Sequence, residues 1–433
     1  MITEERSLLS ILNVDAKKFA LYTAENRALP NVIDGFKPVQ RFFICRALQL
    51  NRSNFTKLAS IGGAVADLGY HHGENSAVEA GALMANTWNN NFPLLEGQGN
   101  FGSRLVQEAA ASRYIFCRIS EGFHKVYKDH NVCPVHEDKE HIPPAFYLPI
   151  IPTVLLNGVK GIATGYATNI LPHNFKSVVE STKAVLQGRE VHPEVEFPKF
   201  SGRIEKTDKG VEIFGTYKFT SKSTMVITEV PIKWDRASYI ADVLDPLEDK
   251  GLITYDDECS RTGFGFKVKF RKEFNLDQND DARIIREFKL SQKIGQFIVV
   301  IDEKGKLRDD FETPLDVVKH FVSVRKPYIQ KRIDTKIKET KDQFDLALER
   351  VLFIKAVLKE EIVLKGKTRA QLVTQLEERN FKNIDKLVSM SIYSMTNDEL
   401  TKLAEKAREL KKEHDYWLTT SVETEYLKDL DSI

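Results

Sequence analysis

The clearest hydrophobic pattern lies in the last third of the chain. Thr313 followed by Pro314 has the form of a helix N-cap with proline at the first helical position. Beyond it, one face stays apolar at steps of three, four or seven residues: Ile329, Ile333, Ile337, Phe344, Leu348 and Val351. This predicts a long helix from 314 to about 364, which Pro327 should kink or restart. A capping box at Thr396 and Glu399 opens a second long helix that could return along the first as an antiparallel coiled coil. A helix packed on its own domain is the alternative.

The first half of the chain has the pattern of short helices joined by turns. Helical spacing of apolar residues recurs over four segments: 1–30, 39–50, 57–67 and 76–88. A turn rich in glycine and histidine, residues 69–73, separates the last two. Short helices of this kind beside basic residues favour a helix-turn-helix or winged-helix unit.

Residues 145–312 have a different sequence pattern: prolines are frequent near their start, and strand-like segments follow. Those segments are 210–220, 224–231 and 265–270, with a helix predicted over 235–249. The complete chain is therefore predicted to be an α+β multidomain protein. At roughly 100–200 residues per domain, its 433 residues suggest two to four domains.

Composition indicates an ordinary globular protein, with 42% apolar and 29% charged residues. No run of about 18 apolar residues occurs and the first residues lack a secretory signal, so we expect a cytoplasmic protein without a membrane partner. The four cysteines form no CxxC pair, which favours reduced thiols over a disulfide or zinc framework.

A net charge of +1 does not by itself indicate a nucleic-acid partner. Residues 35–66, however, contain no Asp or Glu and five basic side chains: Lys37, Arg41, Arg46, Arg52 and Lys57. Such a block can be a phosphate-binding face, or simply a solvated helix surface.

Several catalytic motifs are absent, including a GxxxxGK[ST] phosphate loop and HExxH. Residues 97–102 match GxGxxG, but they follow a poor strand, so they predict a tight loop rather than a dinucleotide site. Tyr114 is the candidate nucleophile, next to Arg113. Tyrosine has a pKa of about 10 and needs a cation or base nearby to react. Neighbouring strand residues point to opposite faces, and a core aromatic is the alternative for Tyr114.

Four segments resemble a known family when taken in order. Residues 26–41 have the sequence NRALPNVIDGFKPVQR, 70–74 have YHHGE, 97–114 begin GQGNFGS and end AAASRY, and 157–174 contain NG, GIA and ATNILPHN. They resemble the breakage-and-reunion subunits of type IIA DNA topoisomerases, the group of DNA gyrase A, topoisomerase IV and topoisomerase II. The short chain most resembles bacteriophage members. It departs from the bacterial pattern at 70–73, where HPHG is usual, and at Phe42, where a second arginine is usual.

The resemblance implies roles for individual residues. Tyr114 would be the nucleophile, supported by Arg113, His72 and Arg27. The residues expected to contact DNA are Lys37, Arg41, Arg46, Lys57 and His71. Ile170 would insert between base pairs and bend the duplex.

The resemblance also implies a division of the chain. We expect an N-terminal helical arm over 1–30 and a winged-helix domain carrying the catalytic tyrosine over 31–145. An α/β tower domain would span 146–312, and a coiled coil ending in a helical dimerisation gate would span 313–433.

The implied activity is a transient double-strand break through 5′-phosphotyrosyl links, through which a second duplex passes. Expected partners are double-stranded DNA, a second copy of this chain and a large subunit that uses ATP and holds Mg²⁺ in a TOPRIM domain. The acidic groups at 256–258 and 429–431 have the pattern of solvated surface. A non-catalytic DNA-binding scaffold is the alternative function. A tyrosine recombinase is disfavoured because no HxxR motif occurs, and a purely structural coiled coil would leave the basic block unexplained.

Overall fold

The protein is described by a computed structural model that covers residues 8, 11–50, 54–391 and 395–433. Contacts divide the chain into two compact units: unit 1 contains residues 1–325 with 430–433, and unit 2 contains 326–429. Within the described ranges no helix is both long and apolar enough to cross a membrane. The finer division into four domains stays a prediction.

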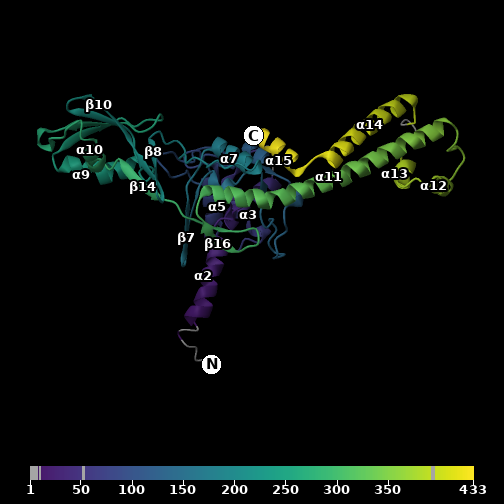
Figure 1. Cartoon of the computed structure of the whole chain (residues 1–433), viewed down its shortest axis with the longest axis horizontal. Helices are drawn as coiled ribbons and strands as arrows, with labels where there is room; N and C mark the ends of the chain where they lie inside the picture. The colour runs from purple at the N-terminus through teal and green to yellow at the C-terminus, as the bar shows by residue number, and fades with distance from the viewer. Residues whose placement is uncertain (1–7, 9–10, 51–53, 392–394) are drawn as a thin grey trace. The chain divides into compact units, whose positions relative to one another are not determined.

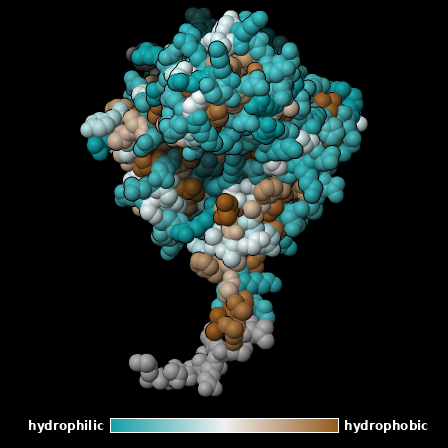
Figure 2. Space-filling model, turned by 90° about the vertical axis from the view of Figure 1, so that its left-hand side faces the viewer, coloured by the Kyte–Doolittle hydropathy of each residue, from teal (hydrophilic) through white to brown (hydrophobic). Residues whose placement is uncertain are grey.

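Unit 1 begins with a helical segment, as the apolar spacing predicts. It consists of η1 (Ile11–Ala16), α2 (Lys17–Thr23) and η2 (Ala24–Ala28), of which η1 and η2 are π-helical. Leu8, Phe19 and Tyr22 are exposed on it. Figure 2 shows hydrophobic side chains gathered on this segment, whereas the rest of the same face is largely hydrophilic.

Helices and a small sheet follow the N-terminal segment. The helices are α3 (Pro38–Leu50), α4 (Leu58–Gly63), η3 (Ala66–Leu68) and α5 (Glu74–Ala85). The strands β1 (Thr56–Lys57), β2 (Leu95–Gln98) and β3 (Phe116–Ile119) form an antiparallel sheet in the order β1-β3-β2. Gly81 lets α5 approach α3 closely, because a Cβ there would lie 2.4 Å from Phe43 Cζ. The residues between β2 and β3, 99–115, are called the Tyr114 loop below.

The middle of unit 1 contains short strands and two helices. They are α6 (Glu121–Val126), β4 (Tyr127–Lys128), η4 (His130–Val132), β5 (Leu148–Pro149), η5 (Thr153–Leu155), β6 (Val159–Ala163), β7 (Tyr166–Ile170) and α7 (Phe175–Leu186). β4 pairs with β5, and β6 with β7, both antiparallel. Phe36, Phe123 and Tyr127 stack in the core beneath them.

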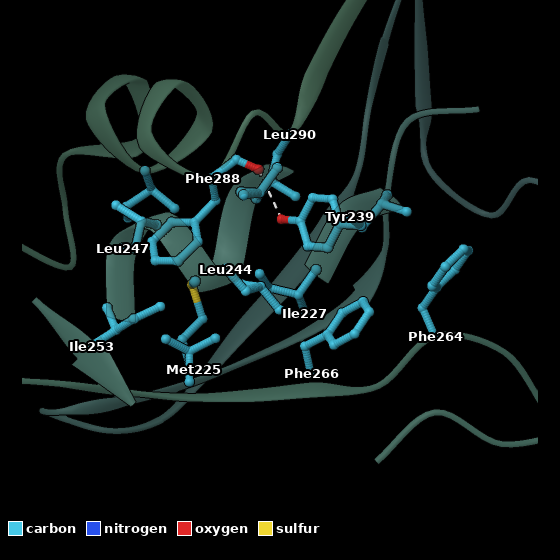
Figure 3. Close-up of a cluster of buried hydrophobic side chains, with 14 of the residues drawn as sticks. Met225, Ile227, Tyr239, Leu244, Leu247, Ile253, Phe264, Phe266, Phe288 and Leu290 are labelled. Carbon is cyan, nitrogen blue, oxygen red and sulfur yellow. Dashed lines mark hydrogen bonds between the residues drawn. The ribbon is translucent and has the colours of Figure 1, made fainter. Parts of the chain in front are cut away.

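Residues 203–295 form an α/β subregion, called the β-lobe below. Its elements are β8 (Arg203–Thr207), β9 (Gly210–Phe214), β10 (Thr216–Ser221), β11 (Thr224–Glu229), α8 (Arg236–Tyr239), η6 (Ile240–Leu244), α9 (Asp245–Asp249), β12 (Ile253–Asp257), β13 (Phe266–Phe270), η7 (Lys272–Phe274), α10 (Asp281–Glu287) and β14 (Ser291–Gly295). The two sheets have the orders β10-β11-β13-β12 and β14-β9-β8. Figure 3 shows the helices burying Leu244, Leu247 and Phe288 against Met225 and Phe266 of the larger sheet. All of the strand segments predicted here contain strands.

A two-stranded sheet of β15 (Ile298–Ile301) and β16 (Leu307–Phe311) leads into α11 (Pro314–Leu358), a helix of 45 residues. The helix begins at Pro314, as the N-cap pattern predicts. Pro327 lies inside it and does not restart it, so that part of the expectation is wrong, and the kink expected as the alternative stays a prediction. Phe321, Arg325 and Ile329 are fully buried around that turn, and this packing outweighs the hydrogen bond that proline removes.

Unit 2 consists of helices. Besides the later part of α11 they are α12 (Arg369–Glu378), α13 (Ile384–Val388), α14 (Asn397–Thr419) and α15 (Val422–Asp431), whose last two residues belong to unit 1. Figure 1 shows α14 running back beside α11, and Thr340 Oγ1 lies 3.1 Å from His414 Nδ1. The predicted N-cap is present, since Thr396 Oγ1 accepts a hydrogen bond from Glu399 N at 3.4 Å.

Candidate nucleophile and nucleic-acid interface

Tyr114 is exposed near the end of the loop that joins β2 to β3. Its backbone N–H donates to Ala111 O at 2.9 Å, so the residue lies in a turn and not on a strand. The next residue, Ile115, is almost fully buried, whereas the Tyr114 side chain is 65% exposed. Burial of Ile115 therefore anchors the chain and leaves the tyrosine hydroxyl accessible to a large substrate.

Arg113 lies on the same side as Tyr114. Its guanidinium carbon is 4.7 Å from the centroid of the tyrosine ring, a cation–π contact. The expectation of opposite faces is wrong because it assumed a strand. A fixed positive charge thus lies beside the exposed phenol, where a phosphate oxygen would approach.

The glycines at 97–102 shape this loop. Gly99 and Gly102 have φ values of +116° and +83°, which side chains with a Cβ rarely adopt. A Cβ at Gly102 would also lie 2.7 Å from Gln107 O. Asn100 closes the turn, since its Oδ1 accepts from Gly102 N and its carbonyl from Ala110 N. The glycines of the GxGxxG match are therefore explained by the backbone conformation and close packing of this loop.

Arg27 and His72 form a second pair. Arg27 Nη2 lies 2.7 Å from His72 Nδ1, which must accept because a guanidinium only donates. Burial, then the charges of Arg27 and His71, lower the pKa of His72, so the ring is neutral near pH 7. The other ring nitrogen, Nε2, lies 3.5 Å from Arg27 Nε, so both ring nitrogens face the guanidinium. The described contacts do not join this pair to Tyr114.

The basic block is only partly available to a ligand. Arg41 is 5% exposed, and its Nε and Nη2 donate to Asp34 Oδ2 and Oδ1 at 2.8 and 3.0 Å. Two of its guanidinium nitrogens are thus engaged in a buried ion pair, which gives Arg41 a structural role, and the DNA contact expected of it stays a prediction. Arg46 is half-buried and lies 3.7 Å from Asp67, whereas Lys57 on β1 is exposed. Arg52 lies outside the described residues.

Lys37 has an internal partner as well. Its Nζ donates to Lys160 O on β6 at 2.7 Å, and burial lowers the pKa of its ammonium group. Lys37 also lines a cavity of about 670 Å³, together with Lys160 and Lys233. The cavity lies between α5, the β6–β7 hairpin and the β-lobe, and its lining also includes Asp34, Glu79 and Arg104. Basic residues outnumber acidic ones in this lining, and its three lysines are called the positive rim below. His71 is exposed and lies 3.8 Å from Glu140.

The β6–β7 hairpin carries two isoleucines that differ in exposure. Ile170 is 2% exposed at the base of the hairpin, where it pairs with Val159 and lines the same cavity as Lys37, and its insertion into DNA stays a prediction. Ile162 is 88% exposed beside the turn at the other end. The hairpin packs on the Arg27 segment, because a Cβ at Gly161 would lie 2.2 Å from Ala28 O. The exposed isoleucine is thus held close to Arg27.

A metal site within this chain has no support in the described ranges, which contain no group of three or more His, Cys, Asp or Glu residues able to hold an ion. In the acidic cluster at 256–258, burial raises the pKa of Asp257, but hydrogen bonds from the Cys259 backbone and from Arg236 outweigh it and leave the pKa lowered.

Comparison with known proteins gives the family. The model of the family that comprises the A-type subunits of DNA gyrase and topoisomerase IV matches residues 27–431. The DNA topoisomerase medium subunit of Enterobacteria phage T4 is 60% identical over the whole of both chains, which confirms the expected resemblance. DNA topoisomerase 2 of Plasmodium falciparum is 27% identical over 99% of this chain and 34% of its own length. This chain thus spans about a third of that larger relative.

A solved structure agrees with the sequence comparison. The crystal structure of the Plasmodium falciparum topoisomerase II DNA-binding, cleavage and re-ligation domain superposes with a TM-score of 0.86 at 27% identity, over 95% of this chain and 62% of that one. The mixed α/β fold with its long helix is therefore that of a type II topoisomerase cleavage region. Among the type II DNA topoisomerases, the chain belongs to the family of the A-type subunits of DNA gyrase and topoisomerase IV.

Proposed function

We propose that this chain is the DNA-cleaving and rejoining subunit of an ATP-dependent type IIA topoisomerase, with Tyr114 as its nucleophile. The observation that carries the proposal is the exposed Tyr114 side chain with the Arg113 guanidinium over its ring, at the end of a loop fixed by buried Ile115. A tyrosine serving the core would be buried.

In the proposed reaction the Tyr114 hydroxyl oxygen attacks a backbone phosphorus in line. The new Oη–P bond replaces the bond from phosphorus to the 3′-oxygen, which leaves as a 3′-hydroxyl after taking up a proton, while the phenol loses its own. One phosphodiester replaces another, so rejoining is the same exchange in reverse and needs no further energy source. Arg113 and Arg27 are the cations suited to the phosphate oxygens, and neutral His72 would orient the Arg27 guanidinium through its ring nitrogens.

DNA would lie over the Tyr114 loop and the positive rim formed by Lys37, Lys160 and Lys233. Lysines at such positions bind phosphates without reading sequence. Ile162 joins Ile170 as a candidate inserting side chain, because an exposed isoleucine at a hairpin end can enter between base pairs.

The proposal requires partners. Cutting both strands takes two copies of Tyr114, so we propose a homodimer, with unit 2 as the dimerisation gate. ATP hydrolysis and the Mg²⁺ that would offset phosphate charge are assigned to a larger partner subunit. The chemistry assigned to this chain uses its own side chains alone.

The test is Tyr114→Phe in the complex with the partner subunit, ATP and Mg²⁺. The variant should bind duplex DNA with unchanged affinity and give no covalent protein–DNA adduct after SDS denaturation. Tyr22→Phe, which alters another exposed tyrosine, is the matched control and should give the wild-type yield of adduct. If Tyr114→Phe still forms adduct, the nucleophile is wrong. If the wild-type complex binds DNA and forms none, the scaffold alternative holds.

A further inference from the structure

Arg104 belongs to the Tyr114 loop but its side chain is buried against the β-lobe. The side chain is 8% exposed, and its Nη2 lies 3.0 Å from Glu229 Oε1. The same guanidinium donates to Val230 O at 2.8 Å and to Ile232 O at 3.3 Å. Its carbon is 5.3 Å from the centroid of the Phe264 ring. One side chain thus joins the loop to several parts of the β-lobe.

Glu229 is held in place from the other side. Its Oε2 accepts hydrogen bonds from the backbone N–H and the hydroxyl of Ser201, each at 3.1 Å, and its Oε1 accepts from Val230 N at 3.0 Å. The carboxylate therefore has fixed donors besides Arg104. A fully bonded, buried carboxylate gives the arginine a rigid acceptor.

The residue after Arg104 adds a second attachment. Leu105 packs against the hydrophobic core of the β-lobe, and its carbonyl accepts from Arg236 N at 3.1 Å. Two consecutive residues of the loop are thus fixed to the β-lobe.

The rest of the loop lacks anchors of this kind. Every residue from 105 to 114 is exposed or only half-buried, and the next buried side chain after Arg104 is Ile115. Backbone hydrogen bonds from Ala110 N to Asn100 O and from Ala59 N to Ser112 O also hold the loop, but its side-chain anchors up to Tyr114 are two. Arg104 holds it to the β-lobe, and Ile115 holds it to the sheet of β1, β2 and β3.

We propose that Arg104 is a positioning residue, which makes the placement of Tyr114 depend on the β-lobe through Glu229. The inference rests on the proposed function, since it concerns the reactivity of Tyr114. A tyrosine displaced by about 1 Å from the line of attack loses rate by up to about 100-fold, although the DNA-binding side chains stay in place.

The experiment uses Arg104→Lys, Glu229→Gln and the double variant in the complete complex with partner subunit, ATP and Mg²⁺. Lysine keeps the charge but cannot make the forked set of bonds. Arg283→Lys is the matched control, because Arg283 also donates to two carbonyls, of Phe274 and Asn275, and lies over the Phe274 ring within the β-lobe. The measurements are the rate of covalent adduct formation at saturating duplex DNA, the Kd for that DNA, and the melting temperature.

We expect adduct formation at saturating DNA to slow by about 10- to 100-fold in Arg104→Lys while Kd changes by less than about twofold. The double variant should be no slower than the slower single variant, because the two residues act as one unit. Arg283→Lys should keep the wild-type rate. If Arg104→Lys does not fold, Glu229→Gln, which keeps the side-chain shape, carries the same expectation.

The positioning role is overturned by a wild-type rate at saturating DNA in both single variants, by multiplicative losses in the double variant, or by an equal loss in Arg283→Lys. These outcomes are distinct from failure of the proposed function. If adduct formation by the wild-type complex does not require Tyr114, the function itself is wrong, whatever Arg104 does.

Discussion

The buried pair of Asp34 and Arg41 gives a prediction that separates folding from DNA binding. The Asp34 carboxylate accepts from Arg41 twice and from the backbone N–H groups of Phe36 and Tyr147, each at 3.0 Å. Arg41→Met removes the cation and leaves Asp34, fully buried, without its counter-charge. Breaking a buried pair in this way costs about 3–5 kcal/mol.

That cost has a measurable thermal consequence. Unit 1 contains about 330 residues, and at roughly 2.1 cal/mol/K per residue its unfolding entropy is about 0.7 kcal/mol/K. The melting temperature should therefore fall by about 4–7 °C in Arg41→Met, as followed by calorimetry. Lys57→Met, at an exposed position on β1, should leave it within about 1 °C, because surface substitutions change stability by less than about 0.5 kcal/mol.

The salt dependence of DNA binding should change in Lys57→Met and not in Arg41→Met. In a titration of Kd against salt below both melting temperatures, Arg41→Met should keep the wild-type slope, since Arg41 Nε and Nη2 donate to Asp34. Lys57→Met should flatten the slope by about 0.9 if Lys57 neutralises one phosphate. A flattened slope with an unchanged melting temperature in Arg41→Met would refute the structural role assigned to this residue.

Two further predictions concern buried and exposed side chains. Ile162→Ala should keep the melting temperature and reduce DNA bending, measured by energy transfer between duplex ends. Ile170→Ala should destabilise unit 1 by about 2–5 kcal/mol. An unchanged bend in folded Ile162→Ala contradicts the insertion of Ile162. Burial lowers the pKa of His173 to about 4, against about 6.5 in an unfolded chain. The unfolded state therefore binds the proton first as pH falls, and about 3 kcal/mol of stability should be lost between about pH 6.5 and 4. His173→Gln should remove that part of the pH dependence in urea unfolding, and an unaltered dependence would contradict the assignment.

Local patterns predicted much of the fold because they depend on nearby residues. The proline at the first helical position correctly gave the start of α11, and the Thr396 cap that of α14. The restart expected at Pro327 is wrong because packing around it involves residues distant in sequence, such as Pro149, whose carbonyl accepts from Arg325 Nε. Helix propensity carries no information on that packing, which here outweighs the cost of the proline.

The candidate site was predicted less well, because charge along the sequence does not reveal pairing in space. The acid-free block begins at Gly35, one residue after Asp34. Asp34, the ion-pair partner of Arg41, was therefore left out when the charges of the block were considered. Arg104 had no signal of its own, since Glu229 lies 125 residues away. Only the fold shows that the loop carrying Tyr114 is tied to the β-lobe.

The turn residues of the β6–β7 hairpin predict where its two isoleucines lie, which the resemblance alone does not. In the register of the hairpin, Ala163 pairs with Tyr166, which leaves Thr164 and Gly165 as a two-residue turn. Gly165 adopts a φ of +82° there, the conformation for which such turns select glycine. A Thr-Gly turn between strand-like runs is visible in the sequence, and it places Ile162 beside the tip and Ile170 at the base next to Leu171 and Pro172. The turn thus predicts which of the two isoleucines is exposed, 88% for Ile162 against 2% for Ile170, and the DNA-bending measurement on the two alanine variants decides between them.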